Sequence, residues 1–134
     1  MTAELELEKL LTAMSPELRE GEYVFSSVTQ EDFDDMQIEP VGWFREVEGI
    51  SLILDRAAAQ RLGLKQSSAY RMISLNVNSS LEAVGFLAAV TEKLAAAGVS
   101  VNAVSAFHHD HLFIPAEKAD LAISLLNDLA ADAA

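Results

Sequence analysis

The sequence predicts an α+β protein made of two small modules with antiparallel sheets. Apolar residues recur with helical spacing in some segments and alternate with polar residues in others, and each half of the chain contains a hairpin followed by a helix. The 134 residues, half of them apolar, suffice for one ordinary domain or two very small modules sharing a core. We expect modules at 1–67 and 68–134, although the halves are too dissimilar to establish a repeat.

The first half is predicted to hold a helix, three strands and a second helix. Apolar residues at helical spacing up to Met14 indicate the opening helix, and Pro16 prevents it from continuing. The strands are predicted at Gly21–Val28, from Trp43 onward and at 50–54, with a tight hairpin at Gly49.

The rest of the first half is less regular. The acidic segment 29–40 is compatible with a short helical turn around 32–36 or with an ordered loop. Residues 57–62 are predicted to form a short helix, with Gly63 at its C-terminal cap. The core is expected to include three aromatic side chains: Phe25, Trp43 and Phe44.

The second half is predicted to run strand, helix, strand, strand, helix. Residues 71–77 alternate in polarity, as in a half-buried strand. Ser79 and Glu82 have the spacing of a capping box, which predicts that a helix starts there, and Gly98 ends this helix.

The end of the chain is predicted to form a hairpin and a helix. A strand is expected at 99–103, a turn at His109-Asp110 and a returning strand at 111–114. Pro115 opens the last helix, where its missing N–H costs nothing. The buried side of this helix is expected to carry Leu121, Leu125 and Leu129.

Composition and charge argue against several function classes. The net charge of −12 repels phosphate backbones and anionic lipids, so we expect no nucleic-acid and no membrane partner. The longest apolar stretch, Val84 to Val90, is far shorter than the roughly 18 residues of a membrane span. The sequence has no cysteine, and its acidic start lacks the pattern of a secretory signal. We therefore expect a cytoplasmic protein.

Several segments resemble the ACT domain. Residues 85–90 and 93–101 are similar to the helix start, the small-residue helix and the following strand of that family. The order of elements from Tyr70 onward resembles its βαββαβ, ferredoxin-like order. Residues 79–85, 109–111 and 21–25 resemble a small stand-alone family with two ACT modules in tandem. The resemblance implies two ferredoxin-like modules, and a function like that of amino-acid sensors, cytosolic arginine sensors among them.

The sequence departs from the family pattern in two places. The Asp-Arg-Pro-Gly-like loop of many amino-acid-binding ACT domains is replaced by residues 78–85, so the resemblance does not identify the ligand. No strand is predicted after the last helix, so the fourth strand of the second module must come from elsewhere. We expect Gly21–Val28 to supply it by strand exchange between the modules, so deleting residues 1–30 should unfold the second half as well.

The resemblance places a ligand at the helix start after Asn78. A helix N-terminus offers free N–H groups to a carboxylate, and Gly85 allows close approach. An ordinary cap with a packing glycine explains the same residues. The ammonium group of an amino acid could be met by Asp110 or by the acidic first half. The expected ligand-binding residues are Asn78, Ser79, Ser80, Leu81, Val84, Gly85, Phe86, Asn102 and Asp110.

Residues 108–111, His-His-Asp-His, form a second candidate site. On a regular strand His109 and His111 share a face, and two imidazoles with a carboxylate could bind zinc. The sequence has no further His or Cys, so a zinc shell would need other carboxylates. A ligand or interface contact and a solvated hairpin tip are the alternatives, and we expect no metal.

The sequence offers little for catalysis. Ser79 or Ser80 with a His and an Asp would compose a triad only superficially, and the sequence contains no nucleophile elbow, G-x-G-x-x-G or P-loop. We expect no catalytic residue and no cofactor. The predicted function is regulatory binding of a small molecule, an amino acid, in a protein that could form a homodimer through its ACT modules. The alternative is a protein-interaction subunit without a ligand, with the Ala-rich helix at 88–97 packing on its partner.

Overall fold

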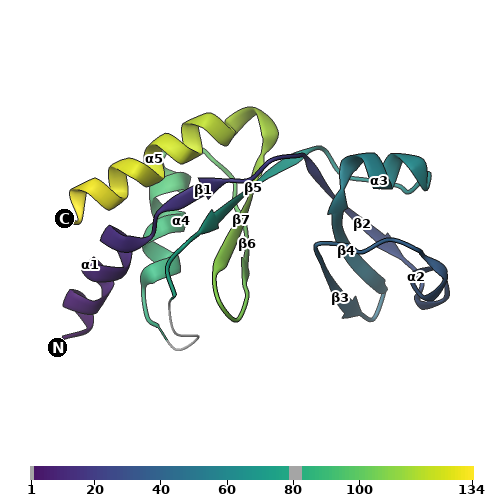
Figure 1. Cartoon of the computed structure of the whole chain (residues 1–134), viewed down its shortest axis with the longest axis horizontal. Coiled ribbons are helices and arrows are strands. Elements are labelled where there is room, and N and C mark those ends of the chain that lie inside the picture. Colours follow the sequence, from purple (N-terminus) through teal and green to yellow (C-terminus); the bar gives the residue numbers. More distant parts are fainter. Residues whose placement is uncertain (1, 79–82) are drawn as a thin grey trace. The chain divides into compact units, whose positions relative to one another are not determined.

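The structure is a computed structural model that describes residues 2–78 and 83–134 (Figure 1). The described residues divide into two compact units. Unit 1 combines residues 1–20 with 71–134, and unit 2 is residues 21–70. Each unit contains helices and antiparallel strand pairs, which confirms the predicted α+β class. The boundary between modules at residues 67 and 68 stays a prediction.

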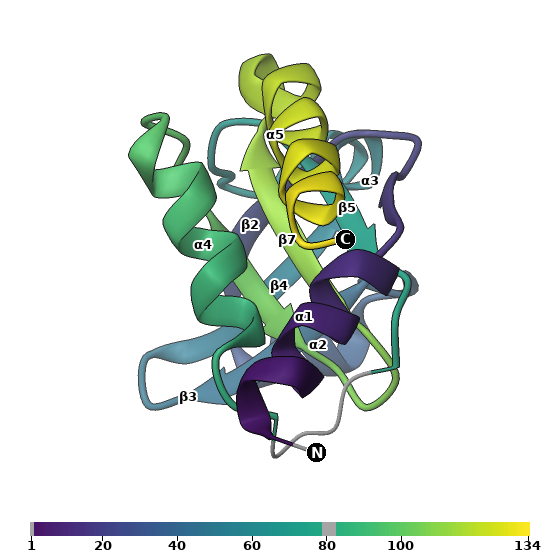
Figure 2. The ribbon, with the colours of Figure 1, turned by 90° about the vertical axis from the view of Figure 1, so that its left-hand side faces the viewer.

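Unit 1 is a sheet with helices packed on one face (Figure 2). Its strands lie in the order β1-β5-β7-β6, and the ladders β1–β5 and β6–β7 are antiparallel. The elements are α1 (Ala3–Ala13), β1 (Pro16–Leu18), β5 (Tyr70–Leu75, whose first residue belongs to unit 2), α4 (Phe86–Ala96), β6 (Asn102–Ser105), β7 (Asp110–Pro115), a short 3-10 helix (Ala116–Lys118) and α5 (Ala119–Asp132).

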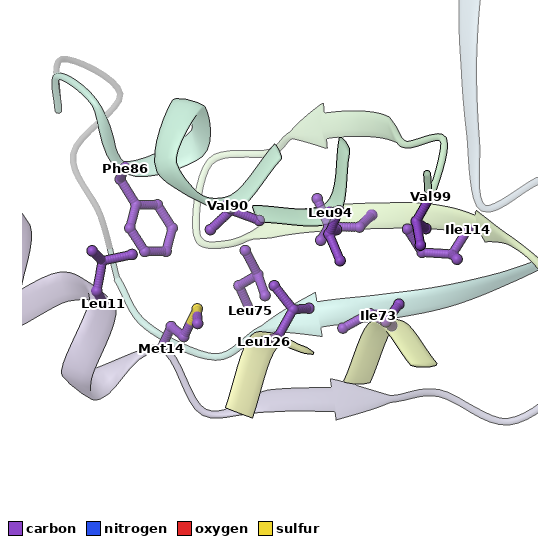
Figure 3. Close-up of a cluster of buried hydrophobic side chains, with 12 residues drawn as sticks. Leu11, Met14, Ile73, Leu75, Phe86, Val90, Leu94, Val99, Ile114 and Leu126 are labelled. Carbon is purple, nitrogen blue, oxygen red and sulfur yellow. The ribbon is translucent and has the colours of Figure 1, made fainter. Parts of the chain in front are cut away.

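The core of unit 1 lies between this sheet and its helices (Figure 3). Alternate residues of β5 and β7 point into it, because successive side chains of a strand face opposite sides. Burying a leucine completely contributes roughly 2–3 kcal/mol, so these side chains dominate the stability of the unit. The buried residues are Leu11, Met14, Ile73, Leu75, Phe86, Val90, Leu94, Val99, Leu112, Ile114, Ala122 and Leu126.

The fourth strand of unit 1 is β1, so the assignment of this role to Gly21–Val28 was wrong. Ser15 has a φ of 41°, which turns the chain from α1 directly into β1. β1 then pairs antiparallel with β5, with Pro16 opposite Leu75. A three-residue strand that begins with proline carries almost no sequence signal, although proline is tolerated at the start of an edge strand.

Unit 2 is a smaller sheet in the order β3-β4-β2, with two short helices. Its elements are β2 (Tyr23–Val28), α2 (Gln30–Asp35), β3 (Gly42–Glu46), β4 (Gly49–Asp55) and α3 (Arg56–Arg61). β2 pairs along its whole length with β4, and Tyr23 also pairs with Tyr70. Segment 29–40 contains a helix, whose first turn is capped by the hydroxyl of Thr29 accepting from the Asp32 N–H at 3.0 Å.

The core of unit 2 contains fewer aromatic residues than the sequence predicted. The buried residues are Val24, Ile50, Leu52, Leu54 and Ala59. Trp43 and Phe44 are 49% and 71% exposed, so their assignment to the core was wrong. Both lie on β3, the edge strand: Trp43 pairs with the core residue Leu52 on the helix-covered face, whereas Phe44 pairs with Ser51 on the opposite face. Phe25 is half-buried, with its ring 5.2 Å from that of Tyr70.

Three predicted boundaries in the second half also need correction. Residues 79–82 lie outside the described residues, but 83 and 84 are not helical and α4 begins at Phe86. Asp110 is the first residue of β7, not part of a turn. On α5 the buried residues are Ala119, Ala122 and Leu126, whereas Leu121 is exposed. Leu125 and Leu129 are partly buried and pack against the core as predicted, so the predicted buried side is wrong only at Leu121. Among the described helices, none is long and apolar enough to cross a membrane.

Candidate functional site

The loop after β5 and the turn before β7 meet at one end of unit 1. The Nδ1 atom of His109 lies 3.4 Å from the backbone oxygen of Val77. Val77 precedes Asn78, the first residue of the predicted ligand-binding loop, and His109 precedes Asp110. The fold therefore brings the two sequence segments that were proposed as sites into contact.

A chain of polar side chains lies on the sheet beside this end. Ser74 is only 1% exposed, and its Oγ lies 2.8 Å from Nδ1 of His111. The guanidinium of Arg19 donates to the same oxygen at 3.5 Å. Because Ile73 and Leu75 on either side of Ser74 face the core, Ser74 and its partners lie on the sheet face opposite the helices. Where β1, β5 and β7 lie side by side, this face of unit 1 therefore carries a hydrogen-bonded group of polar side chains together with the buried Met72 and Phe113.

The surroundings of His111 favour its neutral form. Burial lowers the pKa of His111, the neighbouring His109 and Arg19 lower it further, and Asp110 opposes them. Arg19 donates to the Ser74 oxygen, and the same hydroxyl shares a hydrogen bond with Nδ1 of His111, in which the donor depends on the imidazole tautomer. Ser74 and His111 do not form a usable nucleophile and base, because Ser74 is shielded from any substrate.

The start of α4 lies next to the same loop and lacks a side-chain cap. Gly85 occupies the N-cap position with a φ of 90°, a conformation that side chains rarely adopt. By contrast, α1, α2 and α3 begin with the capping side chains of Thr2, Thr29 and Asp55. Among the residues that the structure describes, α4 thus begins without a side-chain cap, as α5 does, and an anion is favoured at this end of the helix dipole.

The other predicted site residues are placed differently. Asn78 and Val84 are exposed, whereas the side chain of Phe86 belongs to the core, so only its backbone can serve a ligand. Asp110 is 7% exposed. Asn102 pairs with Phe113, three residue pairs away from the Asp110–Ser105 pair, which is about 10 Å along the strand. Asn102 is therefore not part of this end of the sheet. Ser79, Ser80 and Leu81 lie outside the described residues.

Sequence reasoning missed three members of the polar chain, Glu17, Arg19 and Ser74. Glu17 accepts from the Asn76 amide at 2.9 Å and pairs with Arg19 at 3.4 Å. The available signal was a serine in an otherwise apolar strand, but nothing in the sequence indicated that β1 would lie beside it. Within residues 2–78 and 83–134, no three His, Cys, Asp or Glu side chains gather as they would around a metal ion.

An open depression of about 380 Å³ lies on unit 2, next to the start of α3. Its charged residues already engage each other, because Arg56 pairs with Glu22 at 2.6 Å and Asp55 caps the helix by accepting from the N–H of Ala57 at 2.9 Å. A ligand there would have to displace these interactions. The α4 start in unit 1 is therefore the better candidate.

Two family models match the sequence, and both are described as ACT domain. One matches residues 2–71 and the other residues 67–128. Among solved structures, a Vibrio cholerae protein of unknown function, described as a possible transport protein, is 41% identical. The match covers 96% of this chain and 99% of that protein, with a TM-score of 0.84. No curated protein matches the sequence significantly.

Two more distant structures share the fold. The protein Atu0741 from Agrobacterium tumefaciens is 14% identical, with a TM-score of 0.68, and the match covers 86% of this chain and 87% of that one. The regulatory subunit of aspartate kinase from Thermus thermophilus is 11% identical, with a TM-score of 0.63, over 86% of this chain and 97% of that one. These matches confirm the predicted arrangement of two ACT modules.

Proposed function

We propose that this chain, which belongs to the ACT-domain family, is a regulatory protein that binds an amino acid and catalyses no reaction. The observation that carries the proposal is the uncapped start of α4 at Gly85, next to the loop that contains Asn78. The likeness to a regulatory subunit of aspartate kinase, which the chain matches over nearly its whole length, supports a regulatory role. The buried Ser74, which no substrate can reach, supports the absence of catalysis.

The proposed ligand is held by complementary charge. Its carboxylate accepts from the first-turn N–H groups of α4, where Gly85 leaves room for close approach. Its ammonium group is directed toward Asp110, whose carboxylate is the buried acid at this end of unit 1. Of the residues predicted for the site, Asn102 and the Phe86 side chain are not used.

An amino-acid panel scored by thermal unfolding tests the proposal. A ligand that binds only the folded protein raises its stability by RT ln(1 + [L]/Kd), which is about 2.7 kcal/mol at a hundredfold excess over Kd. We expect one amino acid or a small group of related ones to raise Tm by several degrees. If no amino acid at 10 mM, a concentration chosen to be about ten times a weak Kd of 1 mM, shifts Tm, the ligand-free interaction subunit becomes the better description.

Two glycines of the same helix provide a matched pair of variants. Gly85 and Gly98 lie before and after α4 with φ values of 90° and 75°, so alanine at either position costs about 1–2 kcal/mol of backbone strain. An added Cβ at Gly85 would meet only Leu7 at 3.6 Å, and one at Gly98 would meet nothing within 4 Å. Gly85→Ala should weaken amino-acid binding at least tenfold by calorimetry, whereas Gly98→Ala should not. Equal affinities in the two variants would place the ligand elsewhere.

A further inference from the structure

An apolar groove of about 380 Å³ lies on unit 2, at the C-terminal ends of the short helices α2 and α3. This volume falls within the roughly 300–1,000 Å³ of small-molecule sites. The groove shares no residue with the site proposed at the start of α4. It is lined by three apolar residues, Met36, Leu62 and Leu64, and by three polar ones, Asp32, Asp35 and Gln37.

The floor of the groove is built by the end of α3. Gly63, with a φ of 65°, and Leu64 both donate their N–H groups to carbonyls of α3 at 3.1 Å, as in a Schellman motif. The motif turns Leu64 back onto the core of unit 2, where Met36 also packs. Leu62 stays 43% exposed and forms a side of the groove. The floor is therefore apolar and open to solvent.

The rim of the groove is acidic. Asp32 and Asp35 are three residues apart on α2, so their side chains lie on the same side of the helix. Among the described residues, neither carboxylate has a hydrogen bond or an ion pair, and no cation lines the groove. By contrast, Asp34 does not line the groove and accepts from the Gln30 amide at 2.9 Å. Two carboxylates thus face the groove without a partner.

The two helices and the charge of the segment also favour a cation in the groove. A helix C-terminus carries the negative end of the helix dipole, and its last carbonyls need donors. The last turn of α2 has no basic residue, and the one in α3, Arg61, does not line the groove. Segment 29–40 contains five acidic residues and no basic one. An ammonium group is therefore attracted to this place, whereas a carboxylate is repelled.

We propose that the groove binds an alkylammonium ion, which is a primary ammonium group on an unbranched hydrocarbon chain. The ammonium group donates to the carboxylates of Asp32 and Asp35. Because it is compact and has three donors, it can serve both at once. The hydrocarbon chain lies along Met36, Leu62 and Leu64.

The combination of an apolar floor and an acidic rim selects this class of ligand. An inorganic cation would gain nothing from the apolar floor, and the rim would repel the carboxylate of a fatty acid. A zwitterionic amino acid carries both charges, so the start of α4 serves it better. An alkylammonium ion uses both parts of the groove, since each methylene that is completely buried strengthens binding about fourfold.

An NMR titration of the full chain tests the ligand class. The salt concentration is set to about 0.1 M, at which exposed charges more than about 10 Å apart are largely screened. We expect pentylammonium to shift the amide signals of residues 32–37 and 62–64 saturably, with a Kd of about 1–5 mM. Propylammonium, which lacks two methylenes, should bind about fourfold more weakly, because an open groove buries each one only in part. Pentanoate, with the opposite charge, should leave these signals in place.

Two matched pairs of variants test the rim and the floor separately. Asp35→Asn should weaken pentylammonium binding about threefold, whereas Asp34→Asn, which removes the same charge one residue away, should change it less than about 1.5-fold. Leu62→Ser should also weaken binding about threefold. Leu121→Ser is its control and should keep the wild-type Kd, because Leu121 is equally exposed, at 43%, but lies in unit 1.

Three results would overturn the proposal. They are the absence of a saturable shift at about 20 mM pentylammonium, four times the weakest expected Kd, equal binding of pentanoate, and equal Kd values in Asp34→Asn and Asp35→Asn. The dispersion of the spectra shows whether each variant is folded. Gly85→Ala, which tests the amino-acid site, should leave the Kd for pentylammonium unchanged, so the two proposals can fail independently.

Discussion

Unit 1 and unit 2 are both antiparallel sheets with helices on one face, yet they bury very different amounts of apolar surface. The described core of unit 1 holds twelve buried residues, drawn from α1, α4, α5 and the sheet. The core of unit 2, all of whose residues are described, holds five. The helices of unit 2 have only six residues each, so they cannot cover the sheet out to its edge.

The difference has consequences for what each unit leaves exposed. In unit 1 the face away from the helices carries a bonded polar chain, with Ser74 almost fully buried beside His111. In unit 2 the incompletely covered sheet exposes aromatic side chains on β3. The first twenty residues contribute to the difference, because Leu11 of α1 and its C-cap Met14 lie in the core of unit 1 and β1 completes its sheet. A short terminal segment can therefore add both core side chains and an edge strand to a module.

Deleting residues 1–20 should cause the largest loss of stability, and it should make unit 1 the less completely closed of the two units. Unit 1 would lose α1, the strand β1 and two fully or nearly fully buried core side chains. Removing one large buried side chain already costs about 2–5 kcal/mol, and the whole stability of a small domain is about 5–15 kcal/mol. We expect the NMR signals of residues 71–134 to lose their dispersion.

A pair of substitutions in α1 provides the control for that deletion. Met14→Ala empties a fully buried position and should cost about 2–4 kcal/mol, whereas Leu5→Ala, at a residue that is 50% exposed, should cost less than about 1 kcal/mol. Urea denaturation measures both. A fragment 21–134 with well-dispersed signals throughout would show that unit 1 does not need the N-terminal segment.

The contrast between buried and exposed leucines of α5 predicts a smaller and more local difference in stability. Leu126 is fully buried, so Leu126→Ala should lower the free energy of unfolding by about 3 kcal/mol through lost burial and a cavity. Leu121 is 43% exposed, and Leu121→Ala should change it by less than about 1 kcal/mol. Alanine has a higher helix propensity than leucine, which further reduces the loss of stability expected for Leu121→Ala. Equal losses in the two variants would show that Leu121 contributes to the core as much as Leu126 does.

The elements of the fold were predictable wherever local chemistry specified them. Gly49, Gly63 and Gly98 all have positive φ at the hairpin or helix end where the sequence placed them. The failures share one cause, which is dependence on distant residues. β1 is a strand because β5 lies beside it, Trp43 is exposed because β3 is an edge, and Phe44 is exposed because it faces away from the core. Apolar character indicates a preference for burial, but it does not show whether the fold provides cover.

The candidate site was predictable to a similar extent. The sequence indicated the loop at Asn78 and the segment around Asp110, and the structure brings their neighbours Val77 and His109 together. It could not indicate Arg19, because the contact with Ser74 spans 55 positions in the chain. It also placed the helix start too early, because the capping-box spacing of Ser79 and Glu82 competed with the left-handed Gly85 that begins α4.

The smallest expected effect concerns the polar face of unit 1 and its response to acid. Burial, His109 and Arg19 hold the pKa of His111 below its usual value of 6.5 in the folded protein. In the unfolded chain that value is restored, so below about pH 6.5 the unfolded state binds a proton that the folded state does not. Stability that is present above pH 6.5 is therefore lost as the pH falls through the folded pKa of His111.

Replacing His111 by glutamine should make the free energy of unfolding depend less on pH. Glutamine can accept a hydrogen bond from Ser74, but it does not titrate. We expect the free energy of unfolding to fall less between pH 7 and pH 5 in His111→Gln than in the wild type, as measured by urea denaturation at half-unit steps. His108→Gln is the matched control, because His108 is exposed in the turn before β7 and should leave the wild-type slope in place. A difference between His111→Gln and wild type that stays constant over this range would mean that protonation of His111 is not coupled to folding. The bond to Ser74 would then act on stability through geometry alone.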